Sequence, residues 1–444
     1  MSAGDTIYAL ATAPGRAGVA VLRISGPQAG AALTALTGKA LPAPRLATLR
    51  RLIDPQDGDA LDQALLLWFP GPASFTGEDV AELHLHGGRA VIAGITAALS
   101  RLPGLRPADA GEFTRRAFAA GKLDLTGVEG LADLVDAETA AQRRQALRQM
   151  GGALAQRVEG WRDRLLRLLA HAEADIDFPD EDLPGGLADR VADGVRALAA
   201  ELSIVLADGH RGERLRDGLH VVIVGAPNVG KSSLLNALAR RDAAIVSHLA
   251  GTTRDVVEVH LELGGYPVIL ADTAGLRDGG DVIEQEGMAR ARARAENADI
   301  VLAVVDAARL PAVEPETLAL LDQRSLLLVN KCDIAASVPA GIAGRPALAL
   351  SARSGEGRDR LLAALSARCA DLFAGAEDGA ITRARHRAAL EECRDRLQDA
   401  LRAPAPELAA EDLRLAARGL GRITGRVDVE DLLDVIFRDF CIGK

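Results

Sequence analysis

The stretch VVIVGAPNVGKSSLLN, residues 221–236, decides how the central part of this chain folds. An apolar run rich in valine leads into Gly225, four further residues and then Gly230-Lys231-Ser232. GxxxxGK[ST] between an expected strand and an expected helix is typical of a phosphate-binding loop. Its glycines let backbone N–H groups turn toward one anion, and the positive end of the helix adds to that field. The stretch predicts a nucleoside triphosphate site, against the plainer alternative of a turn that only joins a strand to a helix.

Length and composition indicate a multidomain protein that folds in water. At 444 residues, two or three domains are expected. A net charge of −10 does not favour nucleic-acid binding over the whole surface, so any RNA contact must come from local basic patches or from a partner. The four cysteines (Cys332, Cys369, Cys393 and Cys441) show neither CxxC spacing nor a disulfide framework, which favours a reducing compartment. Since we find neither a leader pattern nor an apolar run of about 20 residues, we expect a cytoplasmic protein.

The first block, residues 1–118, mixes alternating strand-like runs with alanine-rich helical stretches, which predicts an α/β or α+β domain. Its strands are expected at 19–24, 64–69 and 80–85. Glu82, His84 and His86 fall at alternate positions of the last run and therefore share one face. Such a set could hold a metal ion, or it could line a polar pocket beside the turn at Gly87-Gly88.

Helical texture occupies residues 119–216 and 374–444, on both sides of the nucleotide-binding stretch. Between them, residues 217–373 alternate apolar strands with helical stretches, which predicts a mostly parallel sheet covered on both faces. Strands are expected at 221–224, 268–271, 300–305, 326–329 and 347–350, with an antiparallel edge hairpin that runs from Val256 and turns through residues 264–267. We infer that the nucleotide domain is inserted into a discontinuous helical domain.

Charge is segregated within the first helical segment. Residues 141–170 hold seven arginines against two acids, whereas residues 171–193 hold eight acids against Arg190. The arginine stretch could touch RNA phosphate, or it could be a solvated helix face that pairs with the acidic segment.

Three further motifs follow strands of the central region. Asp272-Thr273-Ala274-Gly275 ends one strand, where the aspartate can hold Mg²⁺ and the Gly275 N–H can contact a γ-phosphate. Asn330-Lys331-Cys332-Asp333 ends a later strand, and the Asp333 carboxylate can accept two hydrogen bonds from guanine, for which adenine has no matching donors. Ser351-Ala352-Arg353 follows the next strand, where its backbone could contact the guanine carbonyl. The order of these motifs predicts GTP as the nucleotide.

Hydrolysis needs hydroxyl ligands for Mg²⁺ and a group that orients the attacking water. Thr252 and Thr253 lie in a segment that can cover the phosphates, and Thr253 is the candidate partner of Ser232 on the metal. Leu276 stands where many GTPases place a water-orienting glutamine, so Glu284 is the leading candidate for that role and Glu286 the next. Because no arginine finger can be assigned, a monovalent cation held beside Asn228 could supply the missing positive charge.

Taken together, these motifs and their flanks resemble the MnmE (TrmE) family of tRNA-modification GTPases, within the TrmE–Era–septin-like GTPases. The resemblance spans almost the whole chain and includes DTIYALATAPGRAGVAVLRISG, ELHLHGG, GEFTRRAF, GKLDLTGVEGLADL, IDFPDED, the nucleotide motifs and the final FCIGK. It implies three parts: an N-terminal α/β domain at 1–118 that dimerises and binds a tetrahydrofolate donor, a helical domain at 119–216 and 374–444, and an inserted Ras-like P-loop GTPase domain at 217–373.

The resemblance also implies an activity. With an FAD-dependent partner of the MnmG (GidA) type, such a homodimer adds an aminomethyl or carboxymethylaminomethyl group to C5 of the wobble uridine of certain tRNAs. The one-carbon donor is a tetrahydrofolate derivative in the 5-formyl or methylene form, FAD belongs to the partner only, and potassium-dependent pairing of two G domains triggers hydrolysis.

Residue roles follow by matching motifs. GTP contacts fall on Asn228, Val229, Gly230, Lys231, Ser232, Ser233, Ser247, Leu249, Thr252, Thr253, Asp272, Thr273, Ala274, Gly275, Asn330, Lys331, Asp333, Ser351, Ala352 and Arg353. The resemblance implies that Asn228, Ser247, the backbone of Leu249 and Thr252 bind potassium. It also implies that Ser232 and Thr253 bind magnesium and that Glu284 acts on the attacking water. Folate contacts fall on Arg23, Glu82, Lys122 and Lys444, so the chain's end is expected to return to its first domain.

The folate set is chemically reasonable, since basic groups suit the carboxylate tail of a folate and a carboxylate suits the N–H edge of its pterin. Cys441 could attack a uridine ring as a thiolate, or it could be an inert cysteine among the apolar residues around it. Two other functions compete with the enzyme: a GTPase switch that docks on RNA or ribosome through Arg143–Arg167, and an N-terminal domain that serves only for dimerisation.

Overall fold

The structure of this protein, a computed structural model, describes residues 4–177, 187–239, 244–245, 258–272, 292–335, 337–375, 381–427, 433, 436–438, 440 and 442–443. It divides into two units assembled from separate segments: Met1–Ala132 with Gln149–Asp177 and Ala410–Lys444, and Asp133–Arg148 with Phe178–Ala409. None of the described helices is both long and apolar enough to cross a lipid bilayer.

A six-stranded sheet organises the first unit. Its strands are β1 Thr6–Leu10, β2 Ala17–Ser25, β3 Thr48–Ile53, β4 Ala60–Phe69, β5 Val80–Gly87 and β6 Leu105–Pro107. Their order across the sheet is β3-β4-β5-β2-β1-β6, and every pair is antiparallel except β1 with β6. The three strands predicted in this block are confirmed as β2, β4 and β5, and the mainly antiparallel pairing matches the α+β alternative.

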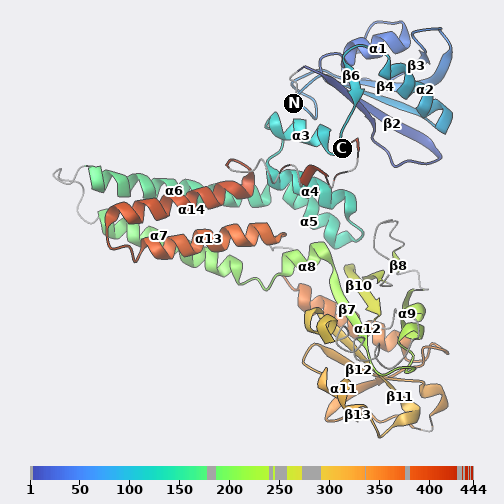
Figure 1. The fold of residues 1–444 in the computed structure, drawn as a ribbon, viewed down its shortest axis with the longest axis vertical. Coiled ribbons are helices and arrows are strands. Elements are labelled where there is room, and N and C mark those ends of the chain that lie inside the picture. Colours follow the sequence, from blue (N-terminus) through green and yellow to red (C-terminus); the bar gives the residue numbers. More distant parts are fainter. Residues whose placement is uncertain are drawn as a thin grey trace, which may run out of the picture. The chain divides into compact units, whose positions relative to one another are not determined.

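Helices α1 (Ala29–Thr37) and α2 (Arg89–Ser100) cover one face of this sheet (Figure 1). Period-two alternation decides which side chains meet them, because Ala81, Leu83 and Leu85 of β5 join the buried cluster that includes both helices. The intervening Glu82 and His84 therefore lie on the opposite face of the sheet.

A partly exposed ion network around the buried Glu112 connects α3 (Glu112–Ala119) to the end of the sheet. Arg106 donates to Asp5 at 2.6 Å and to both carboxylate oxygens of Glu112 at 2.6 and 2.8 Å. Arg116 donates to the same two acids and to Glu78. These shared partners fix the loop that ends at Glu78 relative to α3.

Two long helices complete the first unit. Helix α6 (Ala153–Asp177) and helix α14 (Pro406–Thr424) run side by side (Figure 1). Arg414 of α14 pairs with Glu173 of α6, and Arg426, just beyond the end of α14, pairs with Glu159. The shorter helix α4 (Leu125–Asp136) begins in the first unit, and most of α5 (Ala140–Met150) belongs to the second unit.

The second unit combines helices with an eight-stranded sheet. Its helices are α7 Leu187–Leu206, α8 Arg211–Asp217, α9 Lys231–Ala239, α11 Pro315–Ala319, α12 Arg358–Phe373 and α13 Ala384–Ala400, with short 3-10 turns at Ala307–Arg309 (η1) and Cys332–Ile334 (η2). Helices α7 and α13 lie side by side, as Figure 1 shows. The buried Arg387 of α13 forms an ion pair with Asp208, just beyond the end of α7.

The large sheet contains β7 Leu219–Val224, β8 Ala244–Ile245, β9 Glu258–Leu263, β10 Tyr266–Asp272, β11 Ile300–Asp306, β12 Ser325–Asn330, β13 Gly341–Ile342 and β14 Arg345–Ala349. Its order is β13-β14-β12-β11-β7-β10-β9-β8, with a parallel centre. Separate apolar clusters cover its two faces, as the near-continuous apolar strands predict. The five strands predicted here are confirmed with small shifts in their bounds.

The hairpin expected after Val256 is confirmed for β9 and β10, with two differences. Its turn is only Gly264-Gly265, because Tyr266 already pairs with Leu263. Strand β9 is not the edge of the sheet, because β8 pairs outside it. The prediction that this hairpin forms the edge of the sheet was therefore wrong. The two residues of β8 are too few to show a strand pattern in the sequence.

Candidate functional site

The loop between β7 and α9 turns where its glycines permit. Gly225 and Gly230 have φ angles of 146° and 99°, and Asn228 has a φ angle of 64°. A Cβ at Gly225 would lie 2.3 Å from the Val304 carbonyl oxygen, and one at Gly230 would lie 2.3 Å from the Asn330 side-chain nitrogen. Any side chain at these two positions would displace the loop from the strands beside it. The helix begins at Lys231, whose Nζ donates to the carbonyls of Gly225 and Ala226 at 2.8 and 2.9 Å.

Asn330, at the end of β12, joins three of the predicted motifs. Its buried side-chain amide donates to the Val229 carbonyl at 2.8 Å, and its amide oxygen accepts from the Ala352 N–H at 2.9 Å. One side chain thus holds the glycine-rich loop and the Ser351–Arg353 segment at a fixed separation.

Lys331 makes a second connection to the loop. Its Nζ donates to the Asn228 carbonyl at 2.9 Å and pairs with the carboxylate of Asp306 at 2.7 Å. Burial by itself would raise the pKa of Asp306, but hydrogen bonds from Lys331 and from the Ala308 N–H hold it below its ordinary value. Asp306 is therefore a carboxylate at neutral pH and anchors the lysine.

The remaining described residues of this site differ in exposure. Asp333, within η2, is exposed to solvent, as is Arg353. Ser351 is buried, and its hydroxyl accepts from the Ser354 N–H at 3.1 Å. Ser232 and Ser233 lie exposed in the first turn of α9. An exposed carboxylate next to the rigid Asn330 junction can accept hydrogen bonds from a planar base.

Arg23 and Glu82 lie opposite each other on β2 and β5, on the sheet face away from α1 and α2. The Nε and terminal nitrogen of Arg23 donate to Oε1 of Glu82 at 3.0 and 2.9 Å. The Arg23 guanidinium also lies 5.6 Å from the ring centre of Phe75 and 5.7 Å from that of Phe113. Phe113 is fully buried and supports Arg23 from beneath, whereas Phe75 is 37% exposed. The exposed ring and the half-buried charge pair thus form one surface, which can bind a flat, polar heterocycle.

Lys122 lies near the loop that carries Phe75. A Cβ at Gly77 would lie 3.6 Å from the Lys122 side chain and 2.9 Å from Ala120, so the segment before α4 packs closely on this loop. The structure thus brings Lys122 to the loop that also borders Arg23.

The chain's end returns to the first strand. Ile442 forms an isolated β-bridge with Ala110, and a Cβ at Gly443 would lie 2.1 Å from the Leu10 carbonyl oxygen. Gly443 has a φ angle of 100°, so both its backbone conformation and this close approach favour glycine. Lys444 itself lies outside the described residues.

The two histidines of β5 have different surroundings. His86 is exposed, and its Nδ1 lies 2.7 Å from Asp62. His84 is half-buried, and its Nε2 lies 3.7 Å from Oε2 of Glu82. Among the residues that the structure describes, no group of three His, Cys, Asp or Glu side chains could hold a metal ion.

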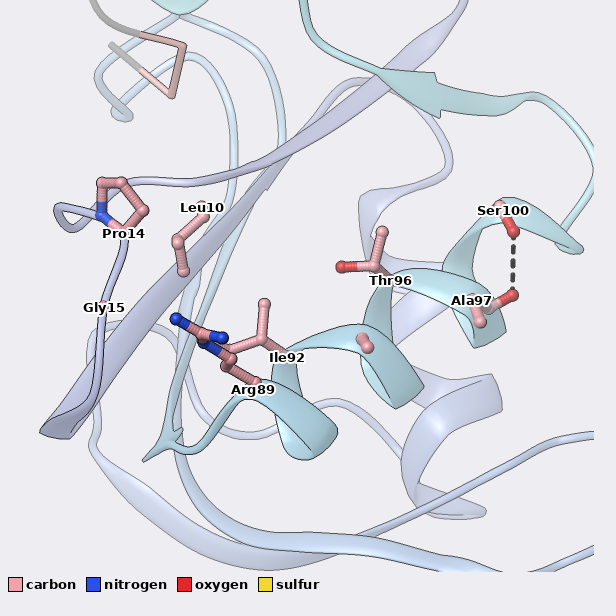
Figure 2. Close-up of a pocket in the computed structure, with 9 residues that line it drawn as sticks. Leu10, Pro14, Gly15, Arg89, Ile92, Thr96, Ala97 and Ser100 are labelled. Carbon is pink, nitrogen blue, oxygen red and sulfur yellow. Dashed lines mark hydrogen bonds between the residues drawn. The ribbon is translucent and has the colours of Figure 1, made fainter.

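A hollow of about 620 Å³ lies elsewhere in the first unit, between the loop after β1 and helix α2 (Figure 2). Its walls include Leu10, Pro14 and Ile92, with Arg89 at the start of the helix. None of the residues predicted to bind a ligand lines this hollow.

Two protein-family models match this chain, one in its N-terminal part and one over the rest. The model of the MnmE helical domain matches residues 125–441, and that of the GTP-binding protein TrmE N-terminus matches residues 6–122. A tRNA modification GTPase MnmE from Parvibaculum lavamentivorans is 60% identical over 446 residues, which cover 99% of this chain and 100% of the relative. The chain belongs to the MnmE family of tRNA modification GTPases.

Other relatives carry related names. The mitochondrial 5-taurinomethyluridine-[tRNA] synthase subunit GTPB3 of Danio rerio is 51% identical, and the alignment covers 99% of this chain and 93% of that protein. A crystal structure of Era with MgGDPNP and a 16S ribosomal RNA segment is 27% identical, with a TM-score of 0.26, over 34% of this chain and 56% of Era. As a member of the MnmE family the chain is a GTPase, and GTPases use GTP with Mg²⁺.

Several predicted residues lie outside the described part of this MnmE family member. They are Ser247, Leu249, Thr252, Thr253, Thr273, Ala274, Gly275, Leu276, Glu284, Glu286, Cys441 and Lys444. Strand β10 ends at Asp272, opposite Ile223 of β7, but the Asp272 side chain is likewise not described. The roles assigned to all of these residues stay predictions.

Three side chains near the sites were not anticipated. Asp306 follows an apolar strand, as Asp272 and Asn330 do, so the same rule could have found it. Phe75 and Phe113 carried no such signal, because contacts between a loop and a helix have no sequence period. Each of the three fixes a charged residue of a candidate site.

Proposed function

We propose that this protein is a potassium-stimulated GTPase that acts in modification of the wobble uridine of certain tRNAs. With an FAD-dependent partner of the MnmG type, a cytoplasmic homodimer adds an aminomethyl or carboxymethylaminomethyl group to C5 of that uridine, with a tetrahydrofolate derivative as one-carbon donor. The domains are those proposed from the sequence: 1–118, 119–216 with 374–444, and 217–373.

The observation that carries the proposal is the junction at Asn330, which ties the glycine-rich loop to the segment expected to contact guanine. In this arrangement Lys231 and the first N–H groups of α9 bind the phosphates, and Asp333 binds the base. Mg²⁺ would be held by Ser232 and Thr253 and would neutralise charge on the phosphate oxygens.

Hydrolysis then depends on residues around the γ-phosphate. Glu284 orients the attacking water in place of the usual glutamine, and Asn228, Ser247, the Leu249 carbonyl and Thr252 hold potassium. The left-handed backbone at Asn228 supports this role, because that residue lies at the turn of the loop and its carbonyl is fixed by Lys331. A cation at this point would stabilise charge that develops in the transition state.

The folate half rests on Arg23, Glu82, Lys122 and Lys444. Support comes from the pairing of Arg23 with Glu82 beside two aromatic rings, from Lys122 next to the same loop, and from Gly443 against Leu10. A folate offers a flat pterin and an anionic tail, which suit these groups. Dimerisation through the N-terminal domain belongs to the same proposal.

GTP hydrolysis should be faster in potassium than in sodium at equal ionic strength. Glu284→Ala should lower kcat by about 10²-fold or more while GTP affinity stays nearly unchanged, because the side chain acts on water and not on the nucleotide. Steady-state kinetics and nucleotide titration measure both. Equal rates in the two salts would remove the cation site, and a large loss of GTP affinity would make Glu284 structural.

Mass analysis of wobble nucleosides in cells that lack this chain tests the modification itself. Loss of the modified uridine supports the enzyme, and an unchanged nucleoside profile would leave a GTPase switch that only binds RNA or ribosome.

A further inference from the structure

His84 stands out on the folate side of the sheet because its ring nitrogen Nε2 is shielded from solvent and has no hydrogen-bond partner among the described residues. Its neighbours across the sheet are Val21 of β2 and Leu65 of β4, which offer no polar group from their side chains. Buried polar atoms in proteins are nearly always bonded, so an unbonded one indicates a missing partner.

The nearest carboxylate does not fill that need. Oε2 of Glu82 lies 3.7 Å from Nε2 of His84, which is too long for a hydrogen bond. Glu82 instead bonds Arg23 through its other oxygen, Oε1. One carboxylate oxygen and one ring nitrogen therefore lie side by side, and neither takes part in a hydrogen bond with the described residues.

We propose that His84 binds the folate directly, as the partner of Glu82 in recognising the pterin. The pterin lactam presents an N–H donor beside a carbonyl acceptor. Oε2 of Glu82 accepts from the N–H, and Nε2 of His84, in the tautomer that carries its proton there, donates to the carbonyl. A ligand edge with both groups thus satisfies the two atoms that the protein leaves unbonded.

The surroundings fit this role better than a structural one. Arg23 balances the charge of Glu82, so a ligand without positive charge can bind the carboxylate. His86, two residues on along the same face, is 72% exposed and already paired with Asp62, whereas the His84 side chain is 29% exposed. Of the two histidines on this face, only His84 combines a shielded ring nitrogen with no hydrogen-bond partner there among the described residues. The proposal rests on the folate site proposed above and adds a residue to it.

Calorimetry on the full-length protein with 5-formyltetrahydrofolate tests the proposal. We expect His84→Ala and His84→Leu to raise Kd by about tenfold, the effect of losing one hydrogen bond to a buried group. His84→Gln, whose amide can reach as far as Nε2, should stay within about threefold of the wild type. The control is His86→Ala, which should stay within about twofold because an exposed side chain contributes little.

Each outcome decides between the claims. Wild-type binding with unchanged affinity in His84→Leu overturns the role of His84 and leaves the folate site intact; leucine suits the apolar row of Val21 and Leu65, so this variant serves even if His84→Ala folds poorly. An equal loss in His86→Ala also overturns it, because the effect would then not be specific to one position. No folate binding by the wild type overturns both the site and this extension, while the potassium-dependent GTPase rate still tests the nucleotide half separately.

Discussion

At the scale of single residues, Asp306 shows how a buried charge supports a nucleotide site without reaching the nucleotide. It is 8% exposed, and its carboxylate holds Lys331, which in turn holds the Asn228 carbonyl in the phosphate-binding loop. The charge on the carboxylate strengthens its hydrogen bond to the lysine. Asp306 therefore positions the glycine-rich loop through Lys331, and it lies beside the proposed base site.

Asp306→Asn should raise the Kd of GTP and of GDP by about fivefold, because Lys331 loses its charged partner and the loop loses a tether. Titration of a fluorescent guanine nucleotide measures the change. Glu314→Gln is the matched control, since Glu314 pairs with the exposed Arg309 in the same region and should have almost no effect. Equal affinities in wild type and Asp306→Asn would show that Asn330 alone holds the loop.

Glu112 makes the stability of the first unit depend on pH. Burial would raise its pKa, but hydrogen bonds from Arg106, the Asp109 N–H and Arg116 outweigh that effect and hold the pKa below its ordinary value. A carboxyl group with a lowered pKa in the folded protein stabilises the fold above its unfolded pKa, and this contribution is lost as the pH falls through the folded pKa.

Glu112→Gln should lower the free energy of unfolding by about 3 kcal/mol at pH 7, because Arg106 and Arg116 keep their charge and lose a buried partner. The difference from wild type should shrink as the pH falls below about 4. Urea unfolding can be followed by the fluorescence of Trp68 in a Trp161→Phe background, since the chain has two tryptophans. Asp109→Asn, at a carboxylate that is 90% exposed, should change stability by less than about 0.5 kcal/mol.

At the scale of elements, two helical glycines should respond in opposite directions to the same substitution. Gly212 of α8 lies against the chain before α13, where a Cβ would be 2.2 Å from the Ile381 carbonyl oxygen, whereas a Cβ at Gly160 of α6 would meet nothing within 4 Å. Gly212→Ala should cost about 1–3 kcal/mol through a forced backbone shift, and Gly160→Ala should add about 0.5–1 kcal/mol. Thermal unfolding of the full chain compares them, and two changes of the same sign would refute the assigned packing.

The elements also show which patterns could be predicted. Long parallel strands such as β7 and β11 are almost entirely apolar because apolar clusters cover both faces of the sheet, so their positions were predictable. The position of β8 at the edge of the sheet was not predictable, because two residues are too few to show the alternation of a strand. Sequence also placed Glu82 and His84 on one face of β5, but their different partners depend on which side chains the neighbouring strands bring.

At the scale of the whole molecule, the end of the chain lies beside its first strand. Gly443→Ala should raise the Kd for 5-formyltetrahydrofolate by about fivefold or more, since a side chain there conflicts with both the Leu10 carbonyl and the left-handed backbone. GTP affinity should not change. Gly18→Ala on β2 is the control, because its Cβ would meet nothing within 4 Å. If Gly443→Ala binds folate as tightly as the wild type, the end of the chain does not contribute to the folate site.

The sequence by itself determined the phosphate-binding loop, the order of the nucleotide motifs and the resemblance to the MnmE family, because these signals are short, local and tied to the ends of strands. Only the tertiary structure decided that Asn330 and Lys331 both bond the loop, that Asp306 anchors the lysine, and that Phe75 and Phe113 flank Arg23. Those contacts join residues far apart in the chain through strand order and loop packing. A local pattern specifies which face or strand end a side chain occupies, whereas its partner there depends on the pairing of distant segments.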